Sequence, residues 1–379
     1  MAGAFVEELA RHLAAEQGAE VVVLAPGCAG APARECLGRM EVRRFQYFWP
    51  AGLQRLAYGS GIPWNLRRSV VAWLNVPLFL WVFAANVCRE GRRADVIHVH
   101  WGPAGALAAL TRMLHGRPVV LTVHGTDWRS RMPLLRWLAR WAVRHCDVVT
   151  TPSKEFNQEF RSVRDGKSGN CWIPNGVNIP PRQQADKAGA RGGRESGGPC
   201  IVSVGRLISE RRHDVLLGAF ARVKEEFPGV TLVLVGDGPE REKLERLASE
   251  LGISEAVEFT GQVPTWEVPQ RLLMADLYVS ATAVDGFGLA VVEAAAHGLP
   301  VVATPVGFAP EIVTDGETGY LVEPGDKARL AEAMALMLRD PEAMRKAGLR
   351  MRERVEERGL TWSQCARKMA DIYRTVGGR

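Results

Sequence analysis

Residues 275–302 read ADLYVSATAVDGFGLAVVEAAAHGLPVV. The apolar run ADLYVSAT is typical of a buried strand, and the glycine-rich loop VDGFG follows it. We expect a helix to begin near Leu289 and to stop before Gly298, because glycine is favoured just past a helix end. The β-branched run that comes next completes a strand–helix–strand unit. This unit predicts an α/β fold with a parallel sheet.

The same alternation fills the rest of the chain. Strand-like runs, several of them separated by helical patterns, recur at residues 20–26, 95–100, 118–125 and 147–153, and again from 200–207 onward. A polar, glycine-rich stretch divides the two series, which is typical of a linker. The chain therefore predicts two Rossmann-like domains, 1–180 and 200–358, joined by a linker at 181–199, with a final helix within 359–379 that packs back on the first domain. Because such sheets bind ligands at the carboxyl ends of their strands, we expect the two sheets to face each other across a cleft.

Composition and charge narrow the class of protein. The chain has 379 residues, of which 47% are hydrophobic and 24% charged, as in folded globular proteins. Its seven cysteines include no C-x-x-C pair, which argues against a zinc site and for reduced thiols in the cytoplasm. Through Asn178 there are 22 Lys and Arg against 13 Asp and Glu, whereas the remainder has 26 against 29. A basic first half suits an anionic membrane or a phosphorylated substrate. Nucleic acid is not expected as a partner, because no zinc finger, ribonucleoprotein motif or basic zipper accompanies the charge.

One apolar segment, SVVAWLNVPLFLWVFAANVC at residues 69–88, is long enough to cross a bilayer. Asn75, Pro77 and Asn86 interrupt it, and it lies inside the α/β alternation. A buried helix and a helix lying on the bilayer surface are both favoured over a spanning helix.

Two acids stand eight residues apart in the opening stretch, Asp285 in the loop and Glu293 within the helix. They need not share a helix face, so we expect them to contact different ends of one extended ligand. Gly286 and Gly288 allow backbone N–H groups to approach an anion, and the helix N-terminus favours negative charge. The arrangement suits a diphosphate with hydroxyl-bearing groups on both sides.

Taken together, the motifs of this chain resemble those of retaining glycosyltransferases with the GT-B fold, a family that includes bacterial polysaccharide and lipid glycosyltransferases and sucrose-type synthases. The family's acid pair and the run after it appear here as DGFGLAVVE followed by AAAHGLPVV. The likeness covers nearly the whole chain, through HVHW (98–101), TVHGTDW (122–128), IPNGVN (173–178), SVGRL (203–207), LVGDGPE (234–240), FTGQV (259–263) and VGFAPEIVTDGETGYLVEPGD (306–326).

This resemblance implies a binding site for a nucleotide sugar. Glu293 would hold the ribose, and Asp285 would hold hydroxyls of the donor sugar. The backbone of residues 287–289, which are Phe287, Gly288 and Leu289, would contact sugar and phosphate. Gly3, at the end of an N-terminal glycine-rich loop, and Val263 complete the expected donor site.

The resemblance also implies how catalysis works. Arg206 and Arg211 would bind the donor diphosphate and stabilise it as it leaves, which is electrostatic catalysis without a metal or other cofactor. His124 would lie near the reacting carbon of the sugar. A retaining mechanism of this kind passes through an oxocarbenium-like state, with departure of the diphosphate from the front face.

Three positions depart from the family pattern. Asp285 stands where the family has a glutamate, and Arg211 and Arg212 stand where it has Lys and Gly. The chain also begins within the expected glycine-rich loop, so we expect that the sequence as written lacks the first strand of the N-terminal domain. Because the inner backbone groups of a sheet would then lose their partners, we expect the natural start to lie about fifteen to twenty residues upstream.

The sequence therefore predicts a retaining glycosyltransferase that acts on a glycan or lipid-linked acceptor, in the cytoplasm or at the inner face of the membrane. Candidate acceptor-binding residues are Arg43, Arg44, Arg55, Arg67 and Arg68, with Tyr47, Phe48, Trp49, Tyr58 and Trp64 among them. Two alternatives remain open at this point. One is a catalytically weak relative that binds a nucleotide sugar or serves as a scaffold, and the other, less favoured, is a GT-B-fold epimerase.

Overall fold

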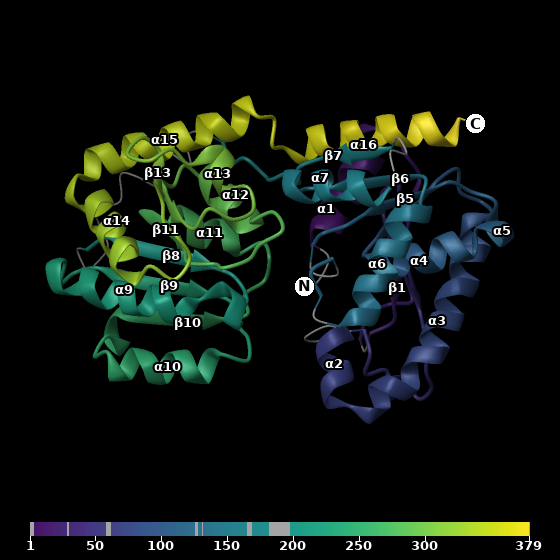
Figure 1. The fold of residues 1–379 in the computed structure, drawn as a ribbon, viewed down its shortest axis with the longest axis horizontal. Coiled ribbons are helices and arrows are strands. Elements are labelled where there is room, and N and C mark those ends of the chain that lie inside the picture. The colour runs from purple at the N-terminus through teal and green to yellow at the C-terminus, as the bar shows by residue number, and fades with distance from the viewer. Residues whose placement is uncertain are drawn as a thin grey trace. The chain divides into compact units, whose positions relative to one another are not determined.

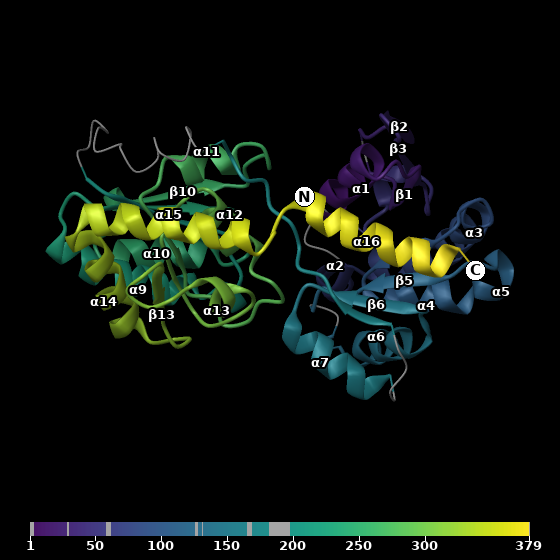
Figure 2. The same cartoon turned by 90° about the horizontal axis from the view of Figure 1, so that it is seen from above.

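A computed structural model describes residues 4–28, 30–57, 62–125, 128–130, 132–164, 169–181 and 198–378. The chain forms two compact units (Figure 1 and Figure 2): unit 1 is Met1–Pro174 with Trp362–Arg379, and unit 2 is Asn175–Thr361. Each unit contains parallel strands with helices packed on them, so the α/β prediction is confirmed. Most of the expected linker lies outside the described residues.

Unit 2 contains a parallel sheet whose strand order reverses at its centre. Across the sheet the described strands are β10 (Val257–Gly261), β9 (Thr231–Val235), β8 (Cys200–Val204), β11 (Leu277–Ser280), β12 (Val301–Ala303) and β13 (Gly319–Leu321). β8 and β11 pair although they are not consecutive in the chain. Ligands bind in open α/β sheets at such a reversal, next to the carboxyl ends of the two strands.

Helices cover both faces of this sheet because its strands are apolar on both sides. They are α9 (His213–Glu226), α10 (Arg241–Glu250), α11 (Val268–Leu273), α12 (Leu289–Ala296), α13 (Ala309–Ile312), α14 (Lys327–Arg339) and α15 (Pro341–Glu357). The helix expected in the opening stretch is confirmed as α12. One buried cluster joins α9 and α14 to the strands, with Phe220 and Leu232 fully buried within it.

Unit 1 contains two sheets. The first has the strand order β1 (Val21–Pro26), β3 (Met40–Phe45), β2 (Arg34–Leu37), with β2 antiparallel to β3. The second is parallel and consists of β4 (Ile97–His100), β5 (Val119–Thr122), β6 (Val148–Thr151) and β7 (Asn170–Trp172). Within the described chain β1 and β4 are edge strands of their sheets, and the upstream strand stays a prediction.

The helices of unit 1 include one from the end of the chain. They are α1 (Ala4–Glu16), α2 (Ile62–Arg68), α3 (Val70–Gly91), α4 (Gly102–Leu110), α5 (Arg112–His115), α6 (Pro133–His145), α7 (Lys154–Val163) and α16 (Trp362–Gly377). Figure 2 shows α16 beside α1, and Leu9 and Leu13 of α1 share a buried cluster with Trp362 and Met369 of α16. The apolar segment at 69–88 forms most of α3.

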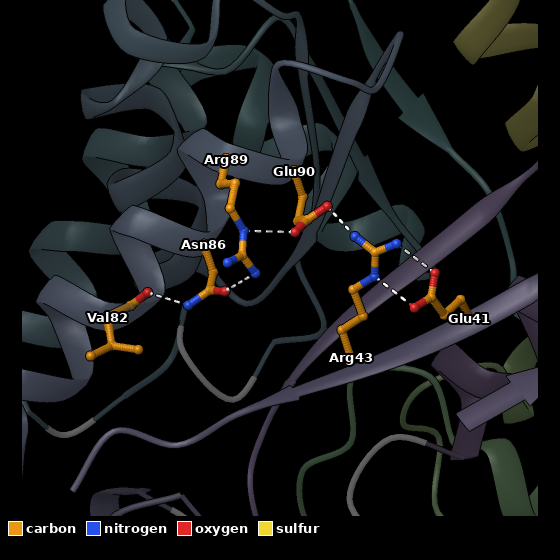
Figure 3. Close-up of polar contacts among 6 residues, drawn as sticks. All are labelled: Glu41, Arg43, Val82, Asn86, Arg89 and Glu90. Atoms are coloured by element: carbon orange, nitrogen blue, oxygen red, sulfur yellow. Dashed lines mark hydrogen bonds and ion pairs between the residues drawn. The ribbon is translucent and has the colours of Figure 1, made fainter. Parts of the chain in front are cut away.

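Arg43, an arginine predicted to bind the acceptor, joins β3 to α3. The guanidinium of Arg43 donates to carboxylate oxygens of Glu41 and Glu90, and Arg89 donates from Nε to Glu90 at 2.9 Å (Figure 3). This ion-pair network compensates the charge of Arg43 within the fold. The assignment of Tyr47 to an exposed acceptor surface was wrong, because its ring is 2% exposed and packs against Phe79. Tyr58 lies outside the described residues.

Candidate active site

The loop after β8 carries the two arginines predicted to bind the diphosphate. β8 ends at Val204, and Gly205 and Arg206 follow at the point where the sheet order reverses. Arg206 is exposed, and its guanidinium has no hydrogen bond or ion pair to any residue that the structure describes. A hydrogen bond from the Ala283 N–H to the Glu210 carbonyl, 2.8 Å long, ties the loop after β11 to the short helix that carries Arg211. The loops that follow β8 and β11 therefore lie next to each other.

Arg211 and Asp285, 74 positions apart in the chain, form an ion pair. Arg211 donates from Nη1 to Asp285 Oδ2 at 2.5 Å, with the side chains 29% and 15% exposed. The same nitrogen lies 3.4 Å from Thr282 Oγ1. The other carboxylate oxygen, Oδ1, accepts from the Phe287 N–H at 3.2 Å and so shapes the loop. The cation predicted to bind the diphosphate and the acid predicted to bind sugar hydroxyl groups are therefore adjacent.

The backbone of the loop before α12 is held in a conformation that needs glycine. Gly288 has a φ of +77°, in the left-handed region, and is the N-cap of α12. The Phe287 carbonyl accepts from the Phe308 N–H at 2.7 Å. Gly307 has a φ of +62°, and a Cβ atom there would lie 2.6 Å from that carbonyl oxygen. The loop 285–288 is thus fixed by a second loop, with Leu289 beginning the helix.

Tyr278 is a residue of this region that the sequence analysis missed. It lies in β11, is 1% exposed, and its hydroxyl lies 3.5 Å from the Val204 carbonyl. Burial raises the pKa of Tyr278, and the nearby charges of Arg211, Asp285 and Glu293 act on it in opposing directions. Glu293 is partly buried on α12. A tyrosine in a strand buried on both faces needs a partner for its hydroxyl, and this was the available signal.

Three further residues of unit 2 are relevant to the predicted site. Val263, two residues past the end of β10, is 9% exposed. His213 begins α9 close to Arg211, and burial, assisted by the charge of Arg211, lowers the pKa of His213 to about 4. Arg212, between them, has a φ of +50°, so it occupies the left-handed conformation in which the resembled family has glycine.

His124 lies in unit 1, just past the end of β5, within a group of three histidines. Its Nε2 lies 3.1 Å from Nδ1 of His100, and the Phe5 ring packs at 4.4 Å between centroids. Burial lowers the pKa of His124 well below 6.5, and the pKa of His100 to about 4. His124 is therefore neutral at pH 7 and carries no positive charge there.

His98 extends this group to the C-terminal helix. Its Nδ1 lies 2.6 Å from the Tyr373 hydroxyl, and its Nε2 lies 2.7 Å from Thr122 Oγ1. The imidazole of His98 packs at 4.3 Å from that of His100. His98 and His100 belong to the HVHW motif, but the sequence predicted no role for them or for Tyr373. α16 thus helps to orient the histidines around His124.

The remaining predicted residue cannot be placed, because Gly3 lies outside the described residues. His124 belongs to unit 1, and Arg206, Arg211, Asp285, Glu293 and the residues around them belong to unit 2. Within unit 2, the structure brings Arg211, Asp285 and Phe287 into direct contact.

Comparison with known proteins identifies the family. The family model "Glycosyl transferases group 1" matches residues 185–358, and "Glycosyltransferase Family 4" matches residues 2–179. The chain is 34% identical to a GDP-mannose-dependent α-(1-6)-phosphatidylinositol monomannoside mannosyltransferase of Mycolicibacterium smegmatis, over 65% of this chain and 68% of that protein. It is 30% identical to a D-inositol 3-phosphate glycosyltransferase of Nocardia farcinica, over 82% of this chain and 76% of that protein.

A solved structure agrees with these relatives. The sucrose-phosphate synthase of Thermosynechococcus elongatus matches with a TM-score of 0.81 and 25% identity, over 98% of this chain and 92% of that chain. The family models together span both units, and the fold agrees with the solved structure. The chain therefore belongs to the group 1 glycosyltransferases of GT-B fold and is an enzyme of the transferase class.

Proposed function

We propose that this enzyme transfers a sugar from a nucleoside diphosphate sugar to a glycan or lipid-linked acceptor, with retention of anomeric configuration and without a metal. The observation that supports the donor class most directly is the Arg211–Asp285 pair at the reversal of the unit 2 sheet. A guanidinium matches the geometry of phosphate oxygens, and a carboxylate accepts hydrogen bonds from sugar hydroxyls. Glu293, farther along α12, would accept hydrogen bonds from the ribose.

The proposed reaction breaks the bond between the anomeric carbon and the phosphate oxygen. The acceptor oxygen bonds to that carbon from the same face, and its proton passes to the departing phosphate oxygen. Negative charge grows on the diphosphate as it leaves, so Arg206 and Arg211 stabilise the transition state more than the ground state. Neutral His124 would hold the donor sugar through a hydrogen bond.

The relatives indicate which donor and acceptor to test first. The Mycolicibacterium smegmatis protein is named as GDP-mannose-dependent and as acting on a phosphatidylinositol monomannoside. We therefore propose GDP-mannose as the first donor and a phosphatidylinositol-type glycolipid as the first acceptor. A lipid-linked acceptor places the enzyme at the inner face of the membrane, and the basic first half of the chain suits an anionic bilayer.

Thermal-shift measurements with GDP-mannose, UDP-glucose and ADP-glucose would identify the donor, because a bound ligand raises the unfolding temperature. Transfer is then measured with EDTA present, and proton NMR of the product gives the anomeric configuration. Inversion, or loss of activity in EDTA, contradicts the proposal. Binding with neither transfer nor donor hydrolysis supports the alternative of a nucleotide-sugar-binding relative. Glu293→Gln should weaken donor binding more than it perturbs the folding of the free protein, and equal donor affinity in the variant would remove Glu293 from the site.

A further inference from the structure

The outer side of α3 is apolar and exposed from Val70 to Trp81. Val70, Trp73, Leu74, Leu78 and Trp81 are here called the α3 face. They lie at positions i, i+3, i+4, i+8 and i+11 and so share one side of the helix. Trp81 is 70% exposed and Val70 77%. From Val70 to Trp81 the face extends about 16 Å. Contiguous apolar surface of this kind marks a site of interaction.

The opposite side of α3 is built into unit 1. Ala72 and Asn75 are fully buried, and Asn75 Oδ1 accepts from the Arg55 N–H at 3.0 Å. The rings of Phe79 and Phe83 pack against Phe45, with centroids 5.7 and 5.6 Å apart. α3 runs along one flank of unit 1 (Figure 1), and by length and composition it is apolar enough to cross a membrane. Crossing would break these contacts, so α3 presents one face outward and stays in the fold.

Positive charge lies at both ends of this face. Arg67 and Arg68 are exposed just before α3, and Arg89, Arg92 and Arg93 are exposed at its end. The one acid in residues 62–93 is Glu90, which is 9% exposed and bonded to Arg43 and Arg89 (Figure 3). Tryptophan is enriched at membrane–water interfaces, and arginine interacts with anionic headgroups. The residue types and their order along α3 match a helix lying in a lipid interface.

We propose that unit 1 docks on an anionic lipid bilayer through the α3 face, with α3 lying in the interface rather than across it. This deepens the proposed function, because it assigns the surface on which a lipid-linked acceptor would be reached. A second copy fits less well. Two α3 faces packed together in either direction would bring the arginines of one copy against those of the other, and like charges repel.

Sedimentation of the full-length protein with vesicles, without any donor, tests the proposal. The protein should bind vesicles of phosphatidylcholine with phosphatidylglycerol, should bind pure phosphatidylcholine far more weakly, and should be released as salt is raised. Replacing both Trp73 and Trp81 by serine should weaken binding at least tenfold. Replacing Arg67 and Arg68 by glutamine should weaken it about fivefold for each arginine removed. Trp266→Ser in unit 2 is the matched control, since Trp266 is 69% exposed. The affinity of this variant for the vesicles should differ from that of the wild type by less than twofold.

Trp73 also donates from Nε1 to the Leu66 carbonyl at 2.8 Å, so its loss can disturb the junction with α2. Leu74→Glu places a charge on the α3 face at a 63% exposed position, and it should abolish binding with the unfolding temperature unchanged. Wild-type binding by the tryptophan or Leu74 variants, or no binding at low salt, overturns the proposal. So does a lipid-free dimer that the Leu74 variant dissociates, or resistance to alkaline carbonate extraction, which indicates a spanning helix. Transfer to a water-soluble acceptor is measured separately, so failure of either proposal leaves the other testable.

Discussion

Replacing Asp285 by asparagine separates its proposed contact with the donor from its contact with Arg211. Asparagine keeps an oxygen that can accept from the Phe287 N–H, but it loses the charge that faces Arg211 at 2.5 Å. Because the two side chains are 15% and 29% exposed, the pair is partly shielded from water, and its loss should cost about 1–2 kcal/mol of unfolding free energy. That corresponds to a fall in unfolding temperature of roughly 2–8 °C.

The effect on catalysis should be larger than the effect on stability. A hydrogen bond from a sugar hydroxyl to a carboxylate contributes about 1.5–3 kcal/mol, so kcat/KM should fall roughly 10- to 150-fold. The assay is the initial rate of transfer at limiting donor, with calorimetry of the same samples. Asp285→Glu is the control, because it keeps the charge and introduces the family's residue, and it should retain most of the activity. Unchanged kcat/KM in the asparagine variant, with a lowered unfolding temperature, would show that Asp285 only shapes the loop.

Three further predictions follow from the same structure. Arg206→Ala should lower kcat more than it raises the donor KM, because the exposed guanidinium meets charge that grows as the diphosphate leaves; a pure KM effect in steady-state kinetics would make it a ground-state anchor. At Arg212, whose φ is +50°, the glycine variant should be more stable than the alanine variant by about 1 kcal/mol. Both variants lose the ion pair with Asp214, but only alanine is strained in the left-handed conformation. Equal midpoints of urea unfolding would contradict this. Burial lowers the pKa of His100 and of His213 to about 4, so between about pH 4 and 6.5 the unfolded chain binds more protons than the folded chain. The free energy of unfolding should therefore be highest above pH 6.5 and should fall by about 3 kcal/mol for each histidine as the pH drops through this range. An unfolding temperature that is constant from pH 7 to 5 would contradict the reasoning.

Much of the fold could be predicted because its signals are local. Short β-branched runs alternating with helical patterns indicate a parallel sheet, and the strand, loop and helix of residues 275–302 are where the sequence predicts them. The candidate site residues of unit 2 were predicted from the motifs, in which glycine, acid and arginine occur at fixed offsets. Gly288 and Gly307 show why: their positive φ values are a local requirement that few other residues satisfy.

The tertiary structure decided which distant groups meet. Arg211 and Asp285 are 74 positions apart, and His98 and Tyr373 are 275 positions apart, so their contacts depend on strand order and on the return of α16 to unit 1. The tertiary structure also decided which face of α3 is buried. A segment that is apolar on most sides carries no periodic signal of which face is buried, and only packing against Phe45 and the pairing of Glu90 with Arg43 set its orientation. Sequence alone therefore determined the elements and the chemistry available to this protein, because backbone preferences and side-chain periodicity act over a few residues. The tertiary structure decided which residues pair and which side chains are buried or exposed, because these properties depend on contacts between residues that are far apart in the chain.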